Sequence, residues 1–133
     1  MAIILDADVI IRGERGAFGL KQWLASQPTE QFQIAAITIA ELWHGVERST
    51  GAYRREREDF IRRFLELVRI LPYIEVTAIE HARIWAELES SGKMIGYYDI
   101  IVAATAIERG STVATFDKRH FNQVKGLKVI EPK

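Results

Sequence analysis

The stretch Ile3-Ile4-Leu5-Asp6-Ala7-Asp8-Val9 decides the fold of this chain. Its opening apolar residues predict a buried strand, and no turn residue separates them from the acidic residues that follow. The strand therefore delivers the carboxylate of Asp6 to its own carboxyl end.

Strand and helix patterns alternate along the rest of the chain. Apolar and β-branched stretches predict further strands at residues 32–37, 74–76, 112–116 and 128–130. Helical spacing predicts helices at about residues 8–15, 18–26, 38–48, 53–68, 77–90 and 99–109. The fold class is therefore α/β, with a mostly parallel central sheet of four to five strands and helices on both faces. We expect one domain over residues 1–133.

Composition narrows the setting of the chain without naming its function. The 18 basic and 18 acidic residues leave no net charge, so any site for a polyanion must be local. There is no cysteine, which excludes disulfides and thiolate chemistry. The longest apolar run, residues 100–107, is far shorter than the ~20 residues that span a bilayer. Since no signal-peptide pattern is present either, we expect a soluble, cytoplasmic protein without a membrane partner.

Four acidic residues stand at junctions between apolar stretches and helices: Asp6, Glu41, Asp99 and Asp117. In a parallel sheet, the carboxyl ends of strands and the amino ends of the connecting helices share one edge. This topology places all four carboxylates on the same side of the molecule.

Each of these acids alone has a simpler explanation as a helix cap. Thr38-Ile39-Ala40-Glu41 has the form of a capping box, and the three aspartates could stabilise helix amino ends. Together, however, like charges about 4 Å apart repel by roughly 4 kcal/mol at an effective dielectric of 20, more than capping returns. Without cysteine or a histidine cluster, these oxygen ligands favour one or two Mg²⁺ or Mn²⁺ ions. Such a site suits phosphodiester hydrolysis.

Four motifs, taken in order, resemble those of PIN-domain ribonucleases. They are Ile4-Leu5-Asp6-Ala7-Asp8-Val9-Ile10, Ile37-Thr38-Ile39-Ala40-Glu41-Leu42 with Gly45, Tyr98-Asp99-Ile100-Ile101-Val102-Ala103-Ala104-Thr105-Ala106, and Val113-Ala114-Thr115-Phe116-Asp117-Lys118 with Phe121. Their order and spacing are similar to those of VapC toxins from toxin–antitoxin pairs, over essentially the whole chain. The resemblance implies a PIN-like three-layer α/β/α fold.

The resemblance also implies a Mg²⁺- or Mn²⁺-dependent endoribonuclease toxin. Its RNA substrate would be cleaved by a homodimer that a cognate antitoxin inhibits. Asp6, Glu41, Asp99 and Asp117 would be the catalytic and metal-binding residues. Asp8 departs from the commonest pattern, which has Asn, Ser or Thr there. It either adds a ligand or tunes the choice of metal, or it is solvated or caps a helix. Thr115 is expected to support the acidic residues without binding the metal itself.

Other residues have weaker functional readings. Possible phosphate contacts are Arg12, Lys93, Lys118 and Arg119. For His44 and His120, a surface or packing role is favoured over ligation. Core packing is favoured for the aromatic residues Tyr97, Tyr98, Trp23, Trp43 and Trp85. The two tyrosines could alternatively stack on a base. The polar run 54–59 is either a solvated helix face or part of an antitoxin-binding clamp formed with the preceding helix.

Two rival functions stay open on the sequence. One is a PIN fold that has lost catalysis and acts as a binding module, although such relatives usually lose acidic positions. The other is a haloacid-dehalogenase-type phosphatase, whose first motif resembles Asp6-Ala7-Asp8-Val9. That chemistry requires a lysine followed by an acidic pair, whereas here Asp117 precedes Lys118.

Overall fold

A five-stranded, wholly parallel sheet organises the chain. The structure is a computed structural model, and it describes residues 2–133. The strands are β1 (Ala2–Leu5), β2 (Gln31–Ala35), β3 (Arg69–Leu71), β4 (Thr112–Ala114) and β5 (Lys128–Ile130), in the spatial order β3-β2-β1-β4-β5. The predicted α/β class is confirmed.

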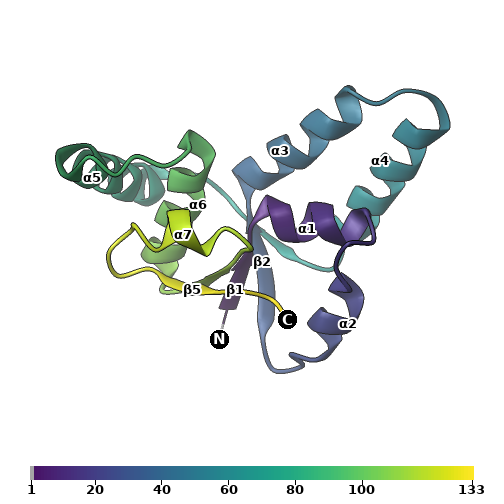
Figure 1. Ribbon diagram of the computed structural model, residues 1–133, viewed down its shortest axis with the longest axis horizontal. Helices are drawn as coiled ribbons and strands as arrows, with labels where there is room; N and C mark the ends of the chain where they lie inside the picture. Colours follow the sequence, from purple (N-terminus) through teal and green to yellow (C-terminus); the bar gives the residue numbers. More distant parts are fainter. Residues whose placement is uncertain (1) are drawn as a thin grey trace.

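Helices cover both faces of this sheet (Figure 1). They are α1 (Ala7–Glu14), α2 (Leu20–Ala25), α3 (Ala36–Glu47), α4 (Gly51–Leu65), α5 (Glu75–Ser91), α6 (Tyr97–Arg109) and α7 (Lys118–Phe121). Within the described residues, no helix combines the length and the apolar character needed to cross a membrane.

Alternation along β1 divides the core in two. Ile3 and Leu5 pack with α1, α2, α3 and α4, whereas Ile4 packs with α5, α6 and α7. Successive strand residues point to opposite faces, so one short strand anchors both helical layers. The two helix groups spread apart on either side of the sheet in Figure 1.

The strand order reverses at β1, and this reversal places the site. The chain first builds β2 and β3 on one side of β1 and then crosses to build β4 and β5 on the other. Leu5 is the register partner of Ala114, so the residues that follow, Asp6 and Thr115, emerge side by side. Ligands of open α/β sheets bind at such a reversal, beyond the carboxyl ends of the strands.

The predicted strand at residues 74–76 is wrong. The strand lies earlier, at Arg69–Leu71, where Leu71 is buried and pairs with Ala35 of β2. Residues 74–76 instead open α5, because the Ile74 backbone N–H donates to the Thr77 hydroxyl at 3.2 Å. Thr77 is thus inside the helix and does not precede it.

The capping box at Thr38–Glu41 is also wrong. Helix α3 begins at Ala36 directly after β2, with Ala35 at the N-cap and no side chain capping it. Thr38 is fully buried inside the first turn. Glu41 therefore lies one turn further along the helix and has no capping role, which removes its simpler explanation.

Three aromatic residues expected in the core lie on the surface. Trp23 is buried and Trp43 is partly buried, but Trp85 is 39% exposed, Tyr97 68% and Tyr98 53%. Trp85 contacts Tyr97 edge-on, with ring centroids 6.2 Å apart. Helical spacing alone could not show that this face of α5 has no helix packed against it.

Candidate active site

Asp6 is the most constrained acid of the sheet edge. Its Oδ1 accepts from the backbone N–H of Ala7 at 2.8 Å, and its Oδ2 accepts from the Thr115 hydroxyl at 2.8 Å. That hydroxyl in turn accepts from the backbone N–H of Asp117 at 2.9 Å. Thr115 is fully buried, so a single side chain connects the carboxyl ends of β1 and β4 to the start of α7.

Asp8 joins the same group from the first turn of α1. Its Oδ2 accepts from the backbone N–H of Phe116 at 3.1 Å and lies 3.4 Å from the Thr115 hydroxyl. Asp8 therefore faces the sheet edge and is half-buried, rather than solvated.

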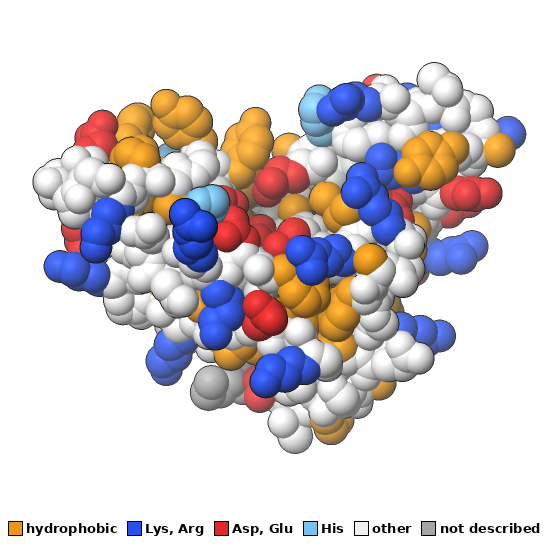
Figure 2. Space-filling model, in the orientation of Figure 1, with side chains coloured by type: hydrophobic (Ala, Val, Ile, Leu, Met, Phe, Trp, Pro, Cys, Tyr) orange, Lys and Arg blue, Asp and Glu red, His pale blue; other side chains and the backbone are white. Residues whose placement is uncertain are grey.

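Glu41 and Asp99 approach this group from two further helices. Electrostatic repulsion from Asp99 and Asp8 acts on Glu41, and repulsion from Asp117 and Asp8 acts on Asp99. Glu41 Oε1 is inaccessible to solvent and has no hydrogen-bond partner within the described part of the chain. The four predicted acids and Asp8 thus lie close to one another. Figure 2 shows a hollow between the two helix groups in which acidic side chains gather.

Burial and mutual repulsion raise the pKa values of these carboxyl groups. The pKa of Asp6 rises to about 8 because burial, then Asp8 and Asp99, disfavour its charge. The pKa of Glu41 rises to about 7 because of burial and then of Asp99 and Asp8. Burial is also the main cause of the raised pKa values of Asp8 and Asp99. The folded chain therefore holds these groups in an arrangement that a cation would stabilise.

The residues present fit a divalent cation. The donors are hard carboxylate oxygens, which Mg²⁺ and Mn²⁺ favour. The unpaired, inaccessible Glu41 Oε1 is the clearest sign, because a buried polar atom without a partner costs free energy that a bound cation would recover.

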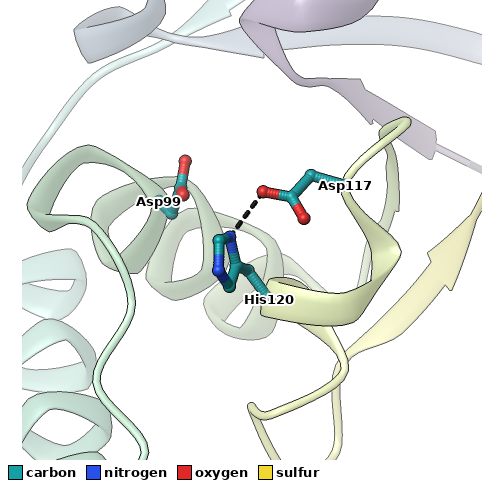
Figure 3. A group of neighbouring side chains, drawn as sticks. All are labelled: Asp99, Asp117 and His120. Atoms are coloured by element: carbon teal, nitrogen blue, oxygen red, sulfur yellow. Dashed lines mark hydrogen bonds and ion pairs between the residues drawn. The ribbon is translucent and has the colours of Figure 1, made fainter.

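Asp117 contacts His120, for which the sequence favoured a surface or packing role over ligation. His120 Nδ1 lies 2.6 Å from Asp117 Oδ2, and both side chains are partly exposed. Figure 3 shows Asp99, Asp117 and His120 directed toward a common space. By contrast, His44 is exposed on α3.

A family model described as the PIN domain matches residues 3–127. The chain belongs to the PIN-domain family. Ribonuclease VapC1 from Rickettsia felis is 34% identical to this PIN domain over 131 residues, covering 98% of the chain and 96% of the relative. The tRNA(fMet)-specific endonuclease VapC from Salmonella typhimurium is 32% identical over 101 residues, covering 76% of the chain and 75% of the relative.

A solved complex agrees with these relatives. The crystal structure of DNA-bound VapBC from Salmonella typhimurium includes a chain that is 25% identical, with a TM-score of 0.89 and 98% coverage of both chains. The predicted resemblance to VapC ribonucleases is confirmed. The match also removes the haloacid-dehalogenase alternative, since a PIN domain accounts for the whole sheet and its acidic edge.

Basic side chains surround the acidic hollow of the PIN domain (Figure 2). Arg12 places its guanidinium carbon 4.2 Å from the centre of the Phe116 ring and stabilises the charge of Asp8. Lys118 and Arg119 are exposed on α7 beside Asp117, and Lys93 is exposed in the loop before α6.

The polar run 54–59 of the PIN domain is not uniformly solvated. Arg54 pairs with Glu47 of α3 at 3.0 Å on the surface. The Arg57 side chain is only 12% exposed and forms a two-pronged ion pair with Glu14 of α1, at 3.1 and 3.2 Å. It also donates to the Gly45 carbonyl at 3.2 Å, so Arg57 holds α1, α3 and α4 together and is not available to a partner.

Two contacts of the PIN domain had no clear signal in the sequence. The Asp8 to Phe116 hydrogen bond joins residues at opposite ends of the chain. The three-residue spacing of Asp117 and His120 was visible, but only the short helix α7 turns it into a contact.

Proposed function

We propose that this PIN domain is a metal-dependent endoribonuclease toxin that hydrolyses RNA phosphodiester bonds. The observation that carries the proposal is the cluster of carboxylates at the sheet reversal, with raised pKa values and the unpaired Oε1 of Glu41. The ribonuclease and endonuclease names of relatives at least 30% identical support RNA as the substrate class.

In this proposal Asp6, Glu41, Asp99 and Asp117 hold one or two Mg²⁺ or Mn²⁺ ions. A divalent cation bound here supplies an activated water and neutralises charge on the phosphate. Thr115 fixes the orientation of Asp6, since its hydroxyl donates to one oxygen while the Ala7 N–H occupies the other.

Asp8 contributes a fifth carboxylate, and its position is set by the Phe116 N–H. Its half-buried place beside Asp6 and Glu41 supports a role in binding the cation, over the alternative of a helix cap.

Arg12 would bind an RNA phosphate at the rim of this hollow. Its stacking on Phe116 holds the guanidinium in place, which reduces the entropy lost when the RNA binds. The exposed Lys118, Arg119 and Lys93 would add contacts that do not depend on base identity.

The test is cleavage of a fluorogenic single-stranded RNA and of total tRNA by the purified chain, with Mg²⁺ or Mn²⁺ and then with EDTA. We expect cleavage that requires the metal and that Asp99→Asn lowers by roughly a hundredfold or more, because it removes a charged metal ligand. Asp59→Asn, an exposed aspartate on α4, is the matched control and is expected to cleave normally.

An Asp99→Asn variant as active as the wild type would overturn the assignment of the site. Metal binding without cleavage of any RNA would instead favour the inactive binding module.

We further propose that a cognate antitoxin binds the groove between α2 and α4. The groove encloses about 770 Å³ and is lined mainly by apolar side chains, among them Leu20, Leu24, Phe60, Phe64 and Leu67. Leu67 is 71% exposed, as expected of a residue that a partner covers. None of the acids that form the cluster lines this groove, so the antitoxin's apolar segment would anchor at a surface separate from the carboxylates. The solved VapBC complex from Salmonella typhimurium supports a protein partner.

A homodimer is the remaining part of the proposal. Several apolar side chains are exposed on α5 and on the segments that flank it: Tyr73, Ile74, Val76, Ile79, Trp85, Met94 and Tyr97. This many exposed apolar side chains on one helix and its flanking segments support an interface between subunits.

A further inference from the structure

Asp99, Asp117 and His120 each offer a ligand atom, and these atoms all lie within 4.8 Å of one another. Figure 3 shows the imidazole between the two carboxylates, with its Nδ1 directed at Asp117. The three residues come from two elements, the first turn of α6 and the start of α7. They form part of the acidic cluster, in which Asp6 has both of its carboxylate oxygens already hydrogen-bonded.

The fold holds the imidazole in this place. His120 is followed by Phe121, which is fully buried and anchors α7 to the core. Consecutive helical residues point about 100° apart, so burying Phe121 leaves His120 on the outer face, above Asp117 at the N-cap. Asp99 is brought opposite by α6, whose buried residues pack on the same half of the core as Phe121.

An ordinary ion pair accounts for only part of this arrangement. A protonated His120 would satisfy Asp117 at 2.6 Å, but it leaves Asp99 facing Asp117. A cation among the three side chains would replace the proton between His120 and Asp117 and would also screen Asp99 from Asp117. The nitrogen then becomes a ligand instead of a competing charge.

We propose that Asp99, Asp117 and His120 form a mixed carboxylate–imidazole site that prefers a transition-metal ion such as Mn²⁺ to Mg²⁺. This inference rests on the proposed metal-dependent function and specifies the metal for one part of that site. Mg²⁺ strongly favours oxygen ligands, whereas transition-metal ions, Mn²⁺ included, accept an imidazole nitrogen more readily.

The test is binding of Mn²⁺ to the full chain, followed by electron paramagnetic resonance and competed with Mg²⁺. We expect the wild type to show ¹⁴N coupling from a coordinated imidazole. His120→Ala should lose that coupling and bind Mn²⁺ roughly tenfold more weakly, with little change for Mg²⁺. His44→Ala removes an exposed histidine from α3 and should behave as the wild type. Circular dichroism of each variant checks that the fold is intact.

Mn²⁺ bound without ¹⁴N coupling, or coupling that persists in His120→Ala, would overturn this inference while leaving the nuclease proposal in place. A chain that binds no Mn²⁺ would overturn this inference too, and if its RNA cleavage also ignored EDTA, the nuclease proposal would fail with it.

Discussion

Replacing Glu41 by Gln should stabilise the metal-free protein. It should also reduce the stabilisation that the protein gains from bound metal. In the folded chain the pKa of Glu41 is raised from 4.5 to about 7, first by burial and then by Asp99 and Asp8. The raised pKa means that the folded state resists ionisation of Glu41. The wild type therefore loses stability as the pH rises from the ordinary pKa of 4.5 through the folded-state pKa of about 7. Gln carries no charge and avoids that loss. Its amide can also donate to the neighbouring carboxylates.

The magnitude follows from the size of the shift. At about 1.4 kcal/mol per pKa unit, full ionisation would cost roughly 3 kcal/mol, and partial solvent exposure of Glu41 reduces this to about 1–2 kcal/mol. For a domain of this size, that corresponds to a rise in Tm of about 3–8 °C at pH 8.5. Near pH 5, only roughly a quarter of the effect should remain, because most of the titration lies at higher pH.

The assay is thermal unfolding in EDTA at pH 5 and pH 8.5, repeated with excess Mn²⁺. Bound metal stabilises the wild type by about 3 kcal/mol at a hundred times its Kd, and the variant, having lost a ligand, should gain less. Glu47→Gln is the matched control, since Glu47 lies at the other end of α3 with its side chain 59% exposed. Its effect should stay within about 0.5 kcal/mol.

Two results would refute this reasoning. One is a Glu41→Gln variant that is less stable than the wild type in EDTA at pH 8.5. The other is an equal gain at both pH values, which would show that charge is not the cause.

Further substitutions test other parts of the structure. Thr115→Val leaves two buried polar partners unsatisfied and should lower the free energy of unfolding in urea by about 1–3 kcal/mol; Thr115→Ser should keep most of it, and equal losses for both would contradict the role of the hydroxyl. Arg57→Ala leaves the partly buried charge of Glu14 without its partner and should lower the free energy of unfolding by about 3–5 kcal/mol. Adding Glu14→Gln should recover part of this loss, and no recovery would mean that the pair is not coupled. Ile79→Glu should sediment as a monomer and still bind antitoxin. Leu67→Glu should remain a dimer and lose antitoxin binding. The same effect from both variants would contradict the assignment of two separate surfaces.

The sequence predicted the parts of the fold in which local pattern and burial coincide. Ile3-Ile4-Leu5 and residues 112–114 are strands because their apolar side chains enter the core on both faces of the sheet. The strand expected at 74–76 failed because Ile74 and Val76 are apolar yet exposed, about 47% and 54%, on the proposed subunit surface. A sequence pattern records that a residue is apolar, not which partner covers it.

The acidic cluster was predictable because topology alone brings strand ends to one edge. Its finer chemistry was not. The positions of Asp8 and Thr115 depend on contacts between residues more than a hundred positions apart, which no local spacing encodes. Glu41 was predictable as an acid of the candidate site, but its capping box was wrong because β2 runs into α3 without a turn, and the N-cap falls at Ala35, three residues before Thr38.

The pairing of β1 with β4 also sets an order of events during synthesis. The residues that line the proposed antitoxin groove end at Leu67, whereas Asp99, Thr115 and Asp117 follow near the end of the chain. At ~5–20 residues per second, the roughly 50 residues that separate Leu67 from Asp117 take about 3–10 s to translate. During that time the residues that line the proposed antitoxin groove have been translated, but the carboxylate cluster is still incomplete. The carboxylate cluster is therefore complete only when nearly the whole chain has been made.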